Sequence, residues 1–317
     1  MRWTIVAIAL TLATAVPAGV AVAAGPQIVV DADTGEVIAS VGADVSWHPA
    51  SLTKLMTAHL ALKAIEEGRL TLYSPVTMSS NAAAQPPSKL GLPAGTRLTM
   101  IEALSAMLVK SANDVAAAVA ETVGGSRQRF VAMMNREAKS MGMTGTRFVD
   151  ANGLDDDMQV TTARDLAVLS VAIIKAHPEA LQLFGLKSAN IQGKAIRNTN
   201  GLLGKDGVDG MKTGYVCASG FNMIATSVRG GRRLVAVVLG EASTKGREAA
   251  AGRLLDLGYS LPETGVRLSG FARSNPKPAT DLKRFACGRK WKGLGKPVQP
   301  GARQPAPEYG KKERKRF

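Results

Sequence analysis

The feature that most constrains the fold is a change of sequence period after about residue 206. Three strand-like stretches follow one another there: GVDGMKTG at 207–214, GFNMIATSVR at 220–229 and RRLVAVVLGE at 232–241. Gly230 and Gly231 indicate a tight hairpin between the last two stretches. Near the start of the chain, IVVDADTGEVIASV at 28–41 has the pattern of another hairpin, with a turn at Asp33-Thr34-Gly35.

Between the early hairpin and the late strands, apolar residues recur with helical spacing. The predicted helices cover about 52–67, 100–109, 114–124, 126–141 and 161–177, and a last helix covers 244–260. Capping patterns at Thr99 with Glu102, and at Thr162 with Asp165, support two of the starts. This order predicts an α+β domain, in which an antiparallel sheet built from both ends of the chain is flanked by helices.

The first 24 residues have the pattern of a secretory signal peptide. Arg2 precedes a long apolar run, and Ala21-Val22-Ala23 is a typical small-x-small cleavage site. An uncleaved membrane anchor is the alternative reading, although Pro17 and Gly19 favour cleavage. We therefore expect an exported protein, periplasmic or associated with the cell envelope, with its catalytic body at 25–265.

Most of the positive charge lies at the C-terminal end. Residues 267–317 carry 15 Lys and Arg against three Asp and Glu, which gives +12 of the chain's net +15. The body is therefore close to neutral, which argues against nucleic-acid binding. Residues 266–317 are also rich in proline, and we expect this tail to be mostly disordered. Electrostatic contact of the tail with a membrane or with wall polymers is a hypothesis.

The two cysteines and three histidines suggest no metal site and no cofactor. Cys217 and Cys287 are a reasonable disulfide candidate in an oxidising compartment, and two free thiols are the alternative. His48, His59 and His177 have no spacing typical of metal ligands.

The stretch PASLTKLMT at 49–57 places a lysine one helical turn after a serine. Ser51 and Lys54 share a helix face that is otherwise apolar. If that face is enclosed, desolvation lowers the lysine pKa, so Lys54 can act as the base that activates Ser51. Ser-x-x-Lys alone is a weak signal, because a serine often caps a helix while a nearby lysine reaches solvent.

Two further stretches raise the significance of this pair. SAN at 111–113 breaks an alanine-rich helix, and KTG at 212–214 lies at the end of a strand. Taken singly, the first is an ordinary helix cap and the second an ordinary turn. Their order and separations resemble those of penicillin-binding proteins and class A β-lactamases.

The resemblance is most specific to serine-type D-alanyl-D-alanine carboxypeptidases, the low-molecular-mass penicillin-binding proteins. It covers about residues 26–259 and includes PASLTKLMT, LVKSANDVAAAVAE, GLDDDMQVTTARDLA, VDGMKTGY, SGFNMIATS and KGREA. It implies a fold of the β-lactamase/transpeptidase type. It also implies peptidoglycan stem peptides as substrates and β-lactams as covalent inhibitors.

The resemblance also implies roles for individual residues. Ser51 would be the nucleophile, Lys54 would take its proton, and Ser111 would relay the proton toward the leaving amine. Asn113 would bind the acyl portion of the substrate. The other implied substrate-binding residues are Lys212, Thr213 and Gly214 of the KTG motif, Tyr215, and Arg247 of KGREA. The backbone N–H groups of Ser51 and Tyr215 would form the oxyanion hole.

The chain also departs from the better-known members of the family. They carry a second, β-rich domain and an amphipathic anchoring helix, and neither pattern is found after residue 265. Thr199 stands where some relatives have a basic residue, which places one substrate contact in doubt.

The predicted activity is removal of the terminal D-Ala from stem peptides through an acyl-enzyme. A D,D-endopeptidase acting on cross-links has the same motifs and is the alternative. A β-lactamase is a weaker one, because the loop DANGLDDDMQVTT at 150–162 has no matching glutamate motif. A wall-binding module without activity is weaker still, because every residue of the motif set is present.

Overall fold

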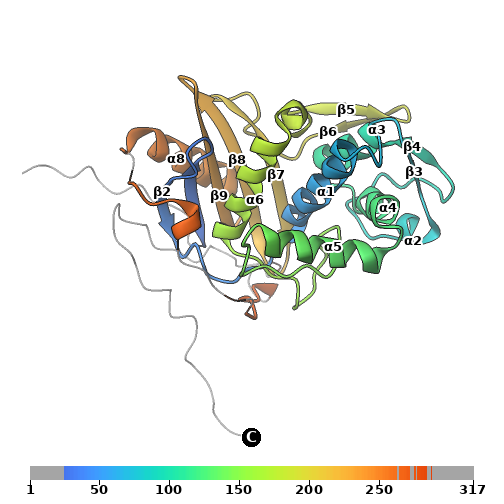
Figure 1. Ribbon diagram of the computed structural model, residues 1–317, viewed down its shortest axis with the longest axis horizontal. Coiled ribbons are helices and arrows are strands. Elements are labelled where there is room, and N and C mark those ends of the chain that lie inside the picture. Colours follow the sequence, from blue (N-terminus) through green and yellow to red (C-terminus); the bar gives the residue numbers. More distant parts are fainter. Residues whose placement is uncertain (1–24, 263, 272–274, 276, 284–286, 288–317) are drawn as a thin grey trace, which may run out of the picture.

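The computed structural model describes residues 25–262, 264–271, 275, 277–283 and 287. Its main sheet has five antiparallel strands in the order β2-β1-β9-β8-β7. The strands are β1 (Gln27–Asp31), β2 (Val37–Val41), β7 (Val208–Val216), β8 (Gly220–Arg229) and β9 (Arg232–Glu241). Strands from both ends of the body thus lie side by side (Figure 1), which confirms the predicted sheet. β7 forms one edge of this sheet.

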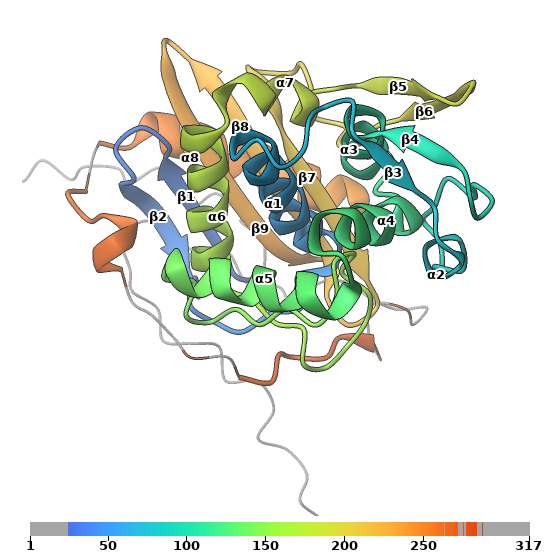
Figure 2. The ribbon, with the colours of Figure 1, turned by 45° about the vertical axis from the view of Figure 1, so that its right-hand side comes forward.

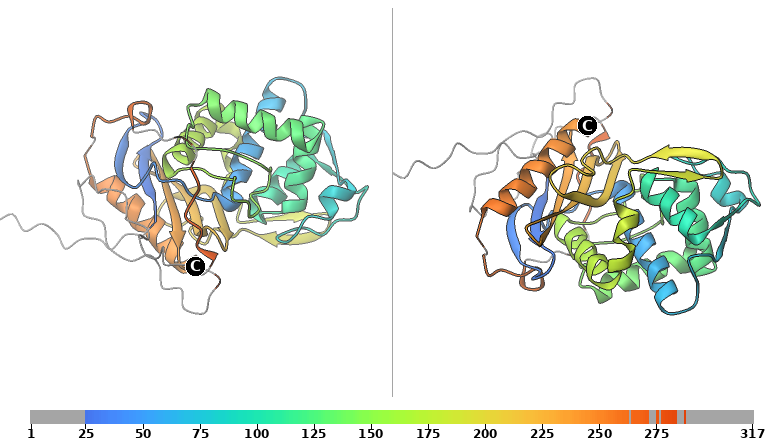
Figure 3. Two further views of the ribbon diagram at one scale, coloured as in Figure 1. Left: turned by 90° about the horizontal axis from the view of Figure 1, so that it is seen from below. Right: turned by 90° about the horizontal axis from the view of Figure 1, so that it is seen from above.

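Both faces of the sheet are buried, and the side chains of β9 point alternately into the two cores. Leu234, Ala236 and Val238 pack with helix α8 (Thr244–Ser260) on one face. Val235 and Val237 belong to the larger core on the other face, where helix α6 (Ala163–Ala176) covers the sheet. Figure 3 shows α8 and the remaining helices on opposite sides of the sheet.

The other helices gather beside β7 (Figures 1 and 2). They are α1 (Lys54–Glu66), α2 (Ser80–Ala83), α3 (Met100–Val109), α4 (Asn113–Gly124), α5 (Arg127–Ser140) and α7 (Leu181–Phe184). Three short 3-10 turns are η1 (Ala50–Thr53), η2 (Pro178–Ala180) and η3 (Leu268–Gly270). Both predicted caps are present: Thr99 and Glu102 form a capping box, and the side chain of Thr162 accepts from the Asp165 N–H.

Two details of the chain differ from the prediction. Ser51 lies in the 3-10 turn η1, and the α-helix itself begins at Lys54. The small hairpin of β5 (Ser188–Ile191) and β6 (Lys194–Arg197) was not predicted, because these four-residue strands carry too few apolar residues to show a period. A second small sheet pairs β3 (Pro75–Thr77) with β4 (Arg97–Thr99).

The described part of the tail packs on the body. Leu268 of η3 and Leu282 are both buried, and the Leu268 N–H donates to the carbonyl of Gly35 at 2.9 Å. Residues 288–317, which carry most of the expected disorder, lie outside the described residues, as do the predicted signal peptide 1–24 and its cleavage site.

No single helix among the described residues is both long and apolar enough to cross a membrane. The pair formed by Ala163–Ala176 and Pro178–Phe184 reaches the required length and composition only when taken together, across a bend of 101°.

A bulge in β9 connects the sheet to the segment that precedes Ser51. Gly240 has a φ of +78° there, and its N–H donates to the side chain of Asn222 at 3.0 Å. The same Asn222 donates to the carbonyls of His48 and Pro49. A Cβ added at Gly240 would lie 2.4 Å from the buried ring of Trp47.

We therefore expect Gly240→Ala to destabilise the fold. The matched control is Gly230→Ala, which also has a positive φ but has open space around it. The control should lose about 1–2 kcal/mol in free energy of unfolding from backbone strain alone. Gly240→Ala should lose about 2 kcal/mol more, because the ring of Trp47 must shift. Urea unfolding of both variants measures this, and equal losses would refute the contact.

Candidate active site

Several segments converge on one cavity of about 360 Å³. Among them are η1, the junction of α3 with α4, the end of β7, the loop at 150–154 and the start of α8. Seven predicted site residues line the cavity: Ser51, Ser111, Asn113, Thr213, Gly214, Tyr215 and Arg247. The other two, Lys54 and Lys212, lie directly behind its wall and are completely buried. The structure thus brings all nine predicted residues together.

The ammonium nitrogen of Lys54 has three close neighbours. Its Nζ lies 3.0 Å from Ser51 Oγ and 2.7 Å from Asn113 Oδ1, and it also contacts the carbonyl oxygen of Asn152. The amide oxygen and the carbonyl can only accept hydrogen bonds. If Lys54 is uncharged, its two N–H groups serve these two acceptors, and its lone pair is directed at the hydroxyl of Ser51.

Burial makes the uncharged form accessible. Desolvation lowers the pKa of Lys54 from 10.5 to about 7, and the carboxylates of Asp150 and Asp114 oppose this shift. Neither carboxylate forms an ion pair with the lysine. Each is instead held by backbone N–H groups, so that its charge is already partly compensated.

Ser111 and Lys212 form a second serine–lysine pair. The Nζ of Lys212 donates to Ser111 Oγ at 2.9 Å and to the carbonyl of Thr213 at 2.9 Å. Burial, and then the positive charges of Lys54 and Arg247, hold the pKa of Lys212 well below its usual value. Ser111 lines the cavity and has a φ of +61°, an uncommon conformation for a serine.

The side chain of Asn113 is already fully hydrogen-bonded. Its oxygen accepts from Lys54, and its Nδ2 donates to the carbonyls of Pro86 at 3.0 Å and Pro87 at 3.2 Å. For Asn113 to bind the acyl portion of a substrate as predicted, its Nδ2 would have to give up one of its hydrogen bonds to Pro86 and Pro87. Asn113 also orients Lys54, a task that its position in the sequence did not suggest.

The loop at 150–154 supports Lys54, a role that the sequence did not reveal. The carboxylate of Asp150 accepts from the N–H groups of Asn152, Gly153 and Leu154. This turn aims the Asn152 carbonyl at Lys54. Gly153 has a φ of +82°, and a Cβ there would lie 1.9 Å from the carbonyl oxygen of Ala50. The Asp-x-Asn-Gly pattern was visible in the sequence, but it is common in ordinary turns.

The opposite wall of the cavity is the free edge of β7. Gly214 permits a close approach to η1, since a Cβ there would lie 3.2 Å from the Ser51 nitrogen. Arg247 donates to the carbonyls of Gly214 at 3.4 Å and Thr199 at 3.2 Å. Thr199 itself has its Oγ1 2.5 Å from that of Thr213. Arg247 thus lies beside Thr199. Because Arg247 belongs to α8, this helix supplies its positive charge to this wall of the cavity.

The lining of the cavity is cationic. Of the described residues that line it, Lys110 and Arg247 are charged and none is a carboxylate. This favours an anionic ligand. Within the described ranges, no group of three His, Cys, Asp or Glu side chains is placed to hold a metal ion.

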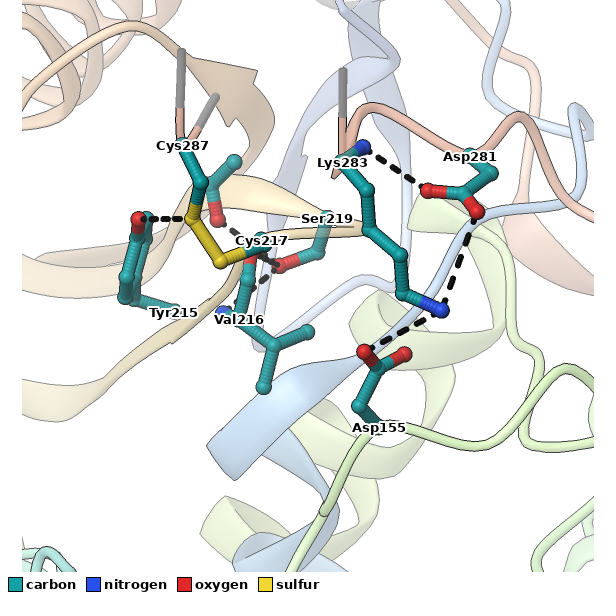
Figure 4. Close-up of a disulfide and its surroundings, with 9 residues drawn as sticks. Asp155, Tyr215, Val216, Cys217, Ser219, Asp281, Lys283 and Cys287 are labelled. Atoms are coloured by element: carbon teal, nitrogen blue, oxygen red, sulfur yellow. Dashed lines mark hydrogen bonds and ion pairs between the residues drawn. A yellow bond between two sulfur atoms is a disulfide. The ribbon is translucent and has the colours of Figure 1, made fainter. Parts of the chain in front are cut away.

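A disulfide joins Cys217 to Cys287, with the two Cα atoms 5.5 Å apart (Figure 4). The sequence left this pairing open. Cys217 directly follows β7, and the Oη of Tyr215 lies 3.3 Å from the Sγ of Cys287. The ring of Tyr215 stacks on that of Phe221 at 4.2 Å, so both its face and its hydroxyl are held.

Known proteins are similar to this chain in sequence and in fold. The chain is 39% identical over 246 residues to D-alanyl-D-alanine carboxypeptidase DacD of Salmonella typhimurium, a match over 75% of this chain and 63% of that enzyme. It is 31% identical to a D-alanyl-D-alanine endopeptidase of Escherichia coli, over 83% and 87% of the two chains. The structure matches cefotaxime-bound penicillin-binding protein D2 of Listeria monocytogenes, with a TM-score of 0.68 and 33% identity over 74% and 96% of the chains.

These matches confirm the predicted fold. The family model described as D-alanyl-D-alanine carboxypeptidase, peptidase S11, matches residues 11–243. The motif set, the convergence of its residues on one cavity and this match agree. The chain belongs to the D-alanyl-D-alanine carboxypeptidase family, peptidase S11.

Proposed function

We propose that this protein is a serine D,D-carboxypeptidase that removes the terminal D-Ala from peptidoglycan stem peptides. The observation that carries the proposal is the arrangement at Lys54. Its Nζ is buried, lies 3.0 Å from Ser51 Oγ, and has two acceptors for its two N–H groups. A serine hydroxyl needs such a base before it can attack a carbonyl carbon.

In the proposed acylation, Ser51 Oγ forms a bond to the carbonyl carbon of the last peptide bond. Its proton moves to Lys54 Nζ as the bond forms. The backbone N–H groups of Ser51 and Tyr215 stabilise the oxyanion. The close approach of β7 to η1 at Gly214, where a Cβ would lie 3.2 Å from the Ser51 nitrogen, supports this pairing of the two walls.

The C–N bond then breaks, and the amine of D-Ala leaves with a proton from the hydroxyl of Ser111, which regains a proton from the Lys54 ammonium, so that Lys54 is uncharged again. Lys212, whose Nζ donates to Ser111 Oγ at 2.9 Å, keeps that hydroxyl oriented. Water hydrolyses the resulting ester and regenerates Ser51. The terminal carboxylate of the substrate would lie near Thr213 and Arg247, where the described lining residues carry positive charge and no carboxylate.

A β-lactam would acylate Ser51 in the same way, with its ring amide in place of the peptide. The cefotaxime-bound relative supports this. Slow release of the adduct is expected, because no carboxylate among the described residues lines the cavity to activate water. A β-lactamase is therefore the less favoured reading.

A D,D-endopeptidase is the second candidate function, favoured by the relative that carries that name. It would use the same acylation chemistry on a cross-linked peptide. Assays of a pentapeptide against a cross-linked dimer separate the two, and we expect faster release of D-Ala from the pentapeptide.

We also propose that the protein works outside the cytoplasm, because its substrate and its relatives belong to the cell wall. Electrostatic contact of the basic tail with a membrane or with wall polymers stays a hypothesis. Its last residues, 288–317, lie outside the described part of the chain.

Ser51→Ala should abolish both the penicillin adduct and the release of D-Ala, because no other residue is proposed to form the acyl bond. Mass spectrometry of the mature protein, incubated with penicillin or with a D-Ala-D-Ala pentapeptide, measures both. A full-strength adduct that maps to another residue would show that the nucleophile is misassigned.

Lys54→Arg should lose acylation almost as fully as Lys54→Ala. Arginine keeps the positive charge but does not deprotonate at working pH, so loss of the base should slow acylation by about 10²–10⁴-fold. Lys63→Arg is the matched control on the same helix, because arginine can keep the ion pair of Lys63 with Glu137. Near-normal acylation by Lys54→Arg would mean that charge, and not basicity, matters at this position.

Acylation should accelerate as the pH rises through about 7. Lys54 has a pKa lowered to about 7, so the uncharged form that can accept a proton gains population above that value. The second-order rate constant for penicillin should climb with pH from about 5.5 and level off above about 8. A constant rate over this range, or a plateau reached only near pH 10, would contradict the assignment.

A further inference from the structure

One stretch of the C-terminal segment, residues 277–283 together with Cys287, lies across the outside of the cavity wall. Ser46 Oγ donates to the Lys277 carbonyl at 2.7 Å. The Leu282 N–H donates to the carbonyl of Ala218 at 3.0 Å. Lys283 pairs with Asp155 at 3.2 Å (Figure 4). We call residues 277–283 together with Cys287 the strap.

Each contact of the strap is made to a segment that holds part of the site. Ser46 lies in the segment that leads to Ser51. Ala218 lies in the turn that follows Tyr215. Asp155 follows directly on the loop whose Asn152 carbonyl contacts Lys54. The strap therefore joins the nucleophile segment, the β7 wall and the loop that supports the base.

The strap has little apolar packing to hold it in place. Among residues 277–283, Leu282 is the one buried side chain. The disulfide from Cys287 to Cys217 and the ion pair of Lys283 are therefore its main fastenings. A disulfide limits the conformations open to such a segment, and we therefore expect the contacts between the strap and the body to persist.

We propose that the strap is a positioning element for acylation, fastened by Cys217–Cys287 and by Lys283–Asp155. It holds the end of β7 at Tyr215, and the loop at 150–157, in a fixed position relative to Ser51. This inference rests on the proposed function, since it deepens the account of that same site. Cys287 acts through Tyr215, whose hydroxyl donates to its sulfur, and Lys283 acts through the loop that carries Asn152.

Four variants of the full chain test the strap. Cys217→Ser with Cys287→Ser removes the disulfide, and Lys283→Met removes the ion pair. Lys283→Arg keeps a cation that can reach Asp155 and should restore the wild-type behaviour. Arg69→Met is the matched control, because it removes an exposed ion pair with Glu67 that lies on a turn after α1.

The first readout separates positioning from binding. Stopped-flow acylation by a fluorescent penicillin gives the acylation rate constant and the dissociation constant of the non-covalent complex. We expect the rate constant to fall about tenfold without the disulfide and about two- to fivefold in Lys283→Met. The dissociation constant should change by less than about twofold. A loss of global stability alone would leave the rate constant of the folded enzyme unchanged.

The second readout does not depend on catalysis. Amide hydrogen exchange should become faster in the segments 150–157 and 213–219 when either fastening is lost, and should stay unchanged in α5. If the wild-type protein forms no adduct, the proposed function fails while the exchange data still decide whether the strap holds these segments. If the double serine variant does not fold, Lys283→Met with its Arg counterpart decides.

Two results would overturn the proposal. One is a folded variant without the disulfide, or without the Lys283 cation, whose acylation rate constant equals that of the wild type. The other is unchanged hydrogen exchange in both segments. The first result includes a variant in which the dissociation constant alone changes, because the strap would then act on binding and not on positioning.

Discussion

The site depends on one interaction, the contact of a buried lysine amine with the hydroxyl of Ser51. Water would keep Lys54 charged, and a charged amine has no lone pair to accept a proton. Complete burial removes that water and lowers the pKa to about 7. Asn113 and the Asn152 carbonyl then take the two N–H groups, so that the remaining lone pair faces the serine.

The surrounding fold maintains this arrangement at a cost in local stability. Two buried lysines that form no ion pair with any residue in the described part of the chain lie in one core region, and Ser111 has an unfavourable backbone conformation. Asp150 and Asp114 compensate by binding backbone N–H groups of the adjacent loops, which fixes the acceptors around Lys54. The antiparallel sheet supplies the rigid wall, because its edge strand β7 lies directly against the turn that carries Ser51.

The sheet and most of the helices could be predicted from local patterns, and the nine candidate site residues from the family resemblance that the three motifs carry. Capping boxes, glycine hairpins and the spacing of the three motifs are short-range features that sequence reveals directly. Asn152 and Asp150 could not be predicted, because they act through backbone atoms, and a carbonyl has no side-chain identity to recognise. The strap could not be predicted for a related reason. Leu282 contacts Ala218 and Lys283 contacts Asp155, which both lie far away in the sequence. The sequence around these two residues is that of a polar, proline-rich tail.

The most direct test of this account is a titration of Lys54 itself. NMR of protein labelled with ¹³C at the lysine side chains follows each Cε signal with pH, and Lys54→Arg and Lys212→Arg assign the two buried lysines. The account predicts that the Lys54 signal titrates near pH 7, with the amine uncharged above that value. A Lys54 signal that titrates near 10.5, together with the exposed lysines, would contradict it.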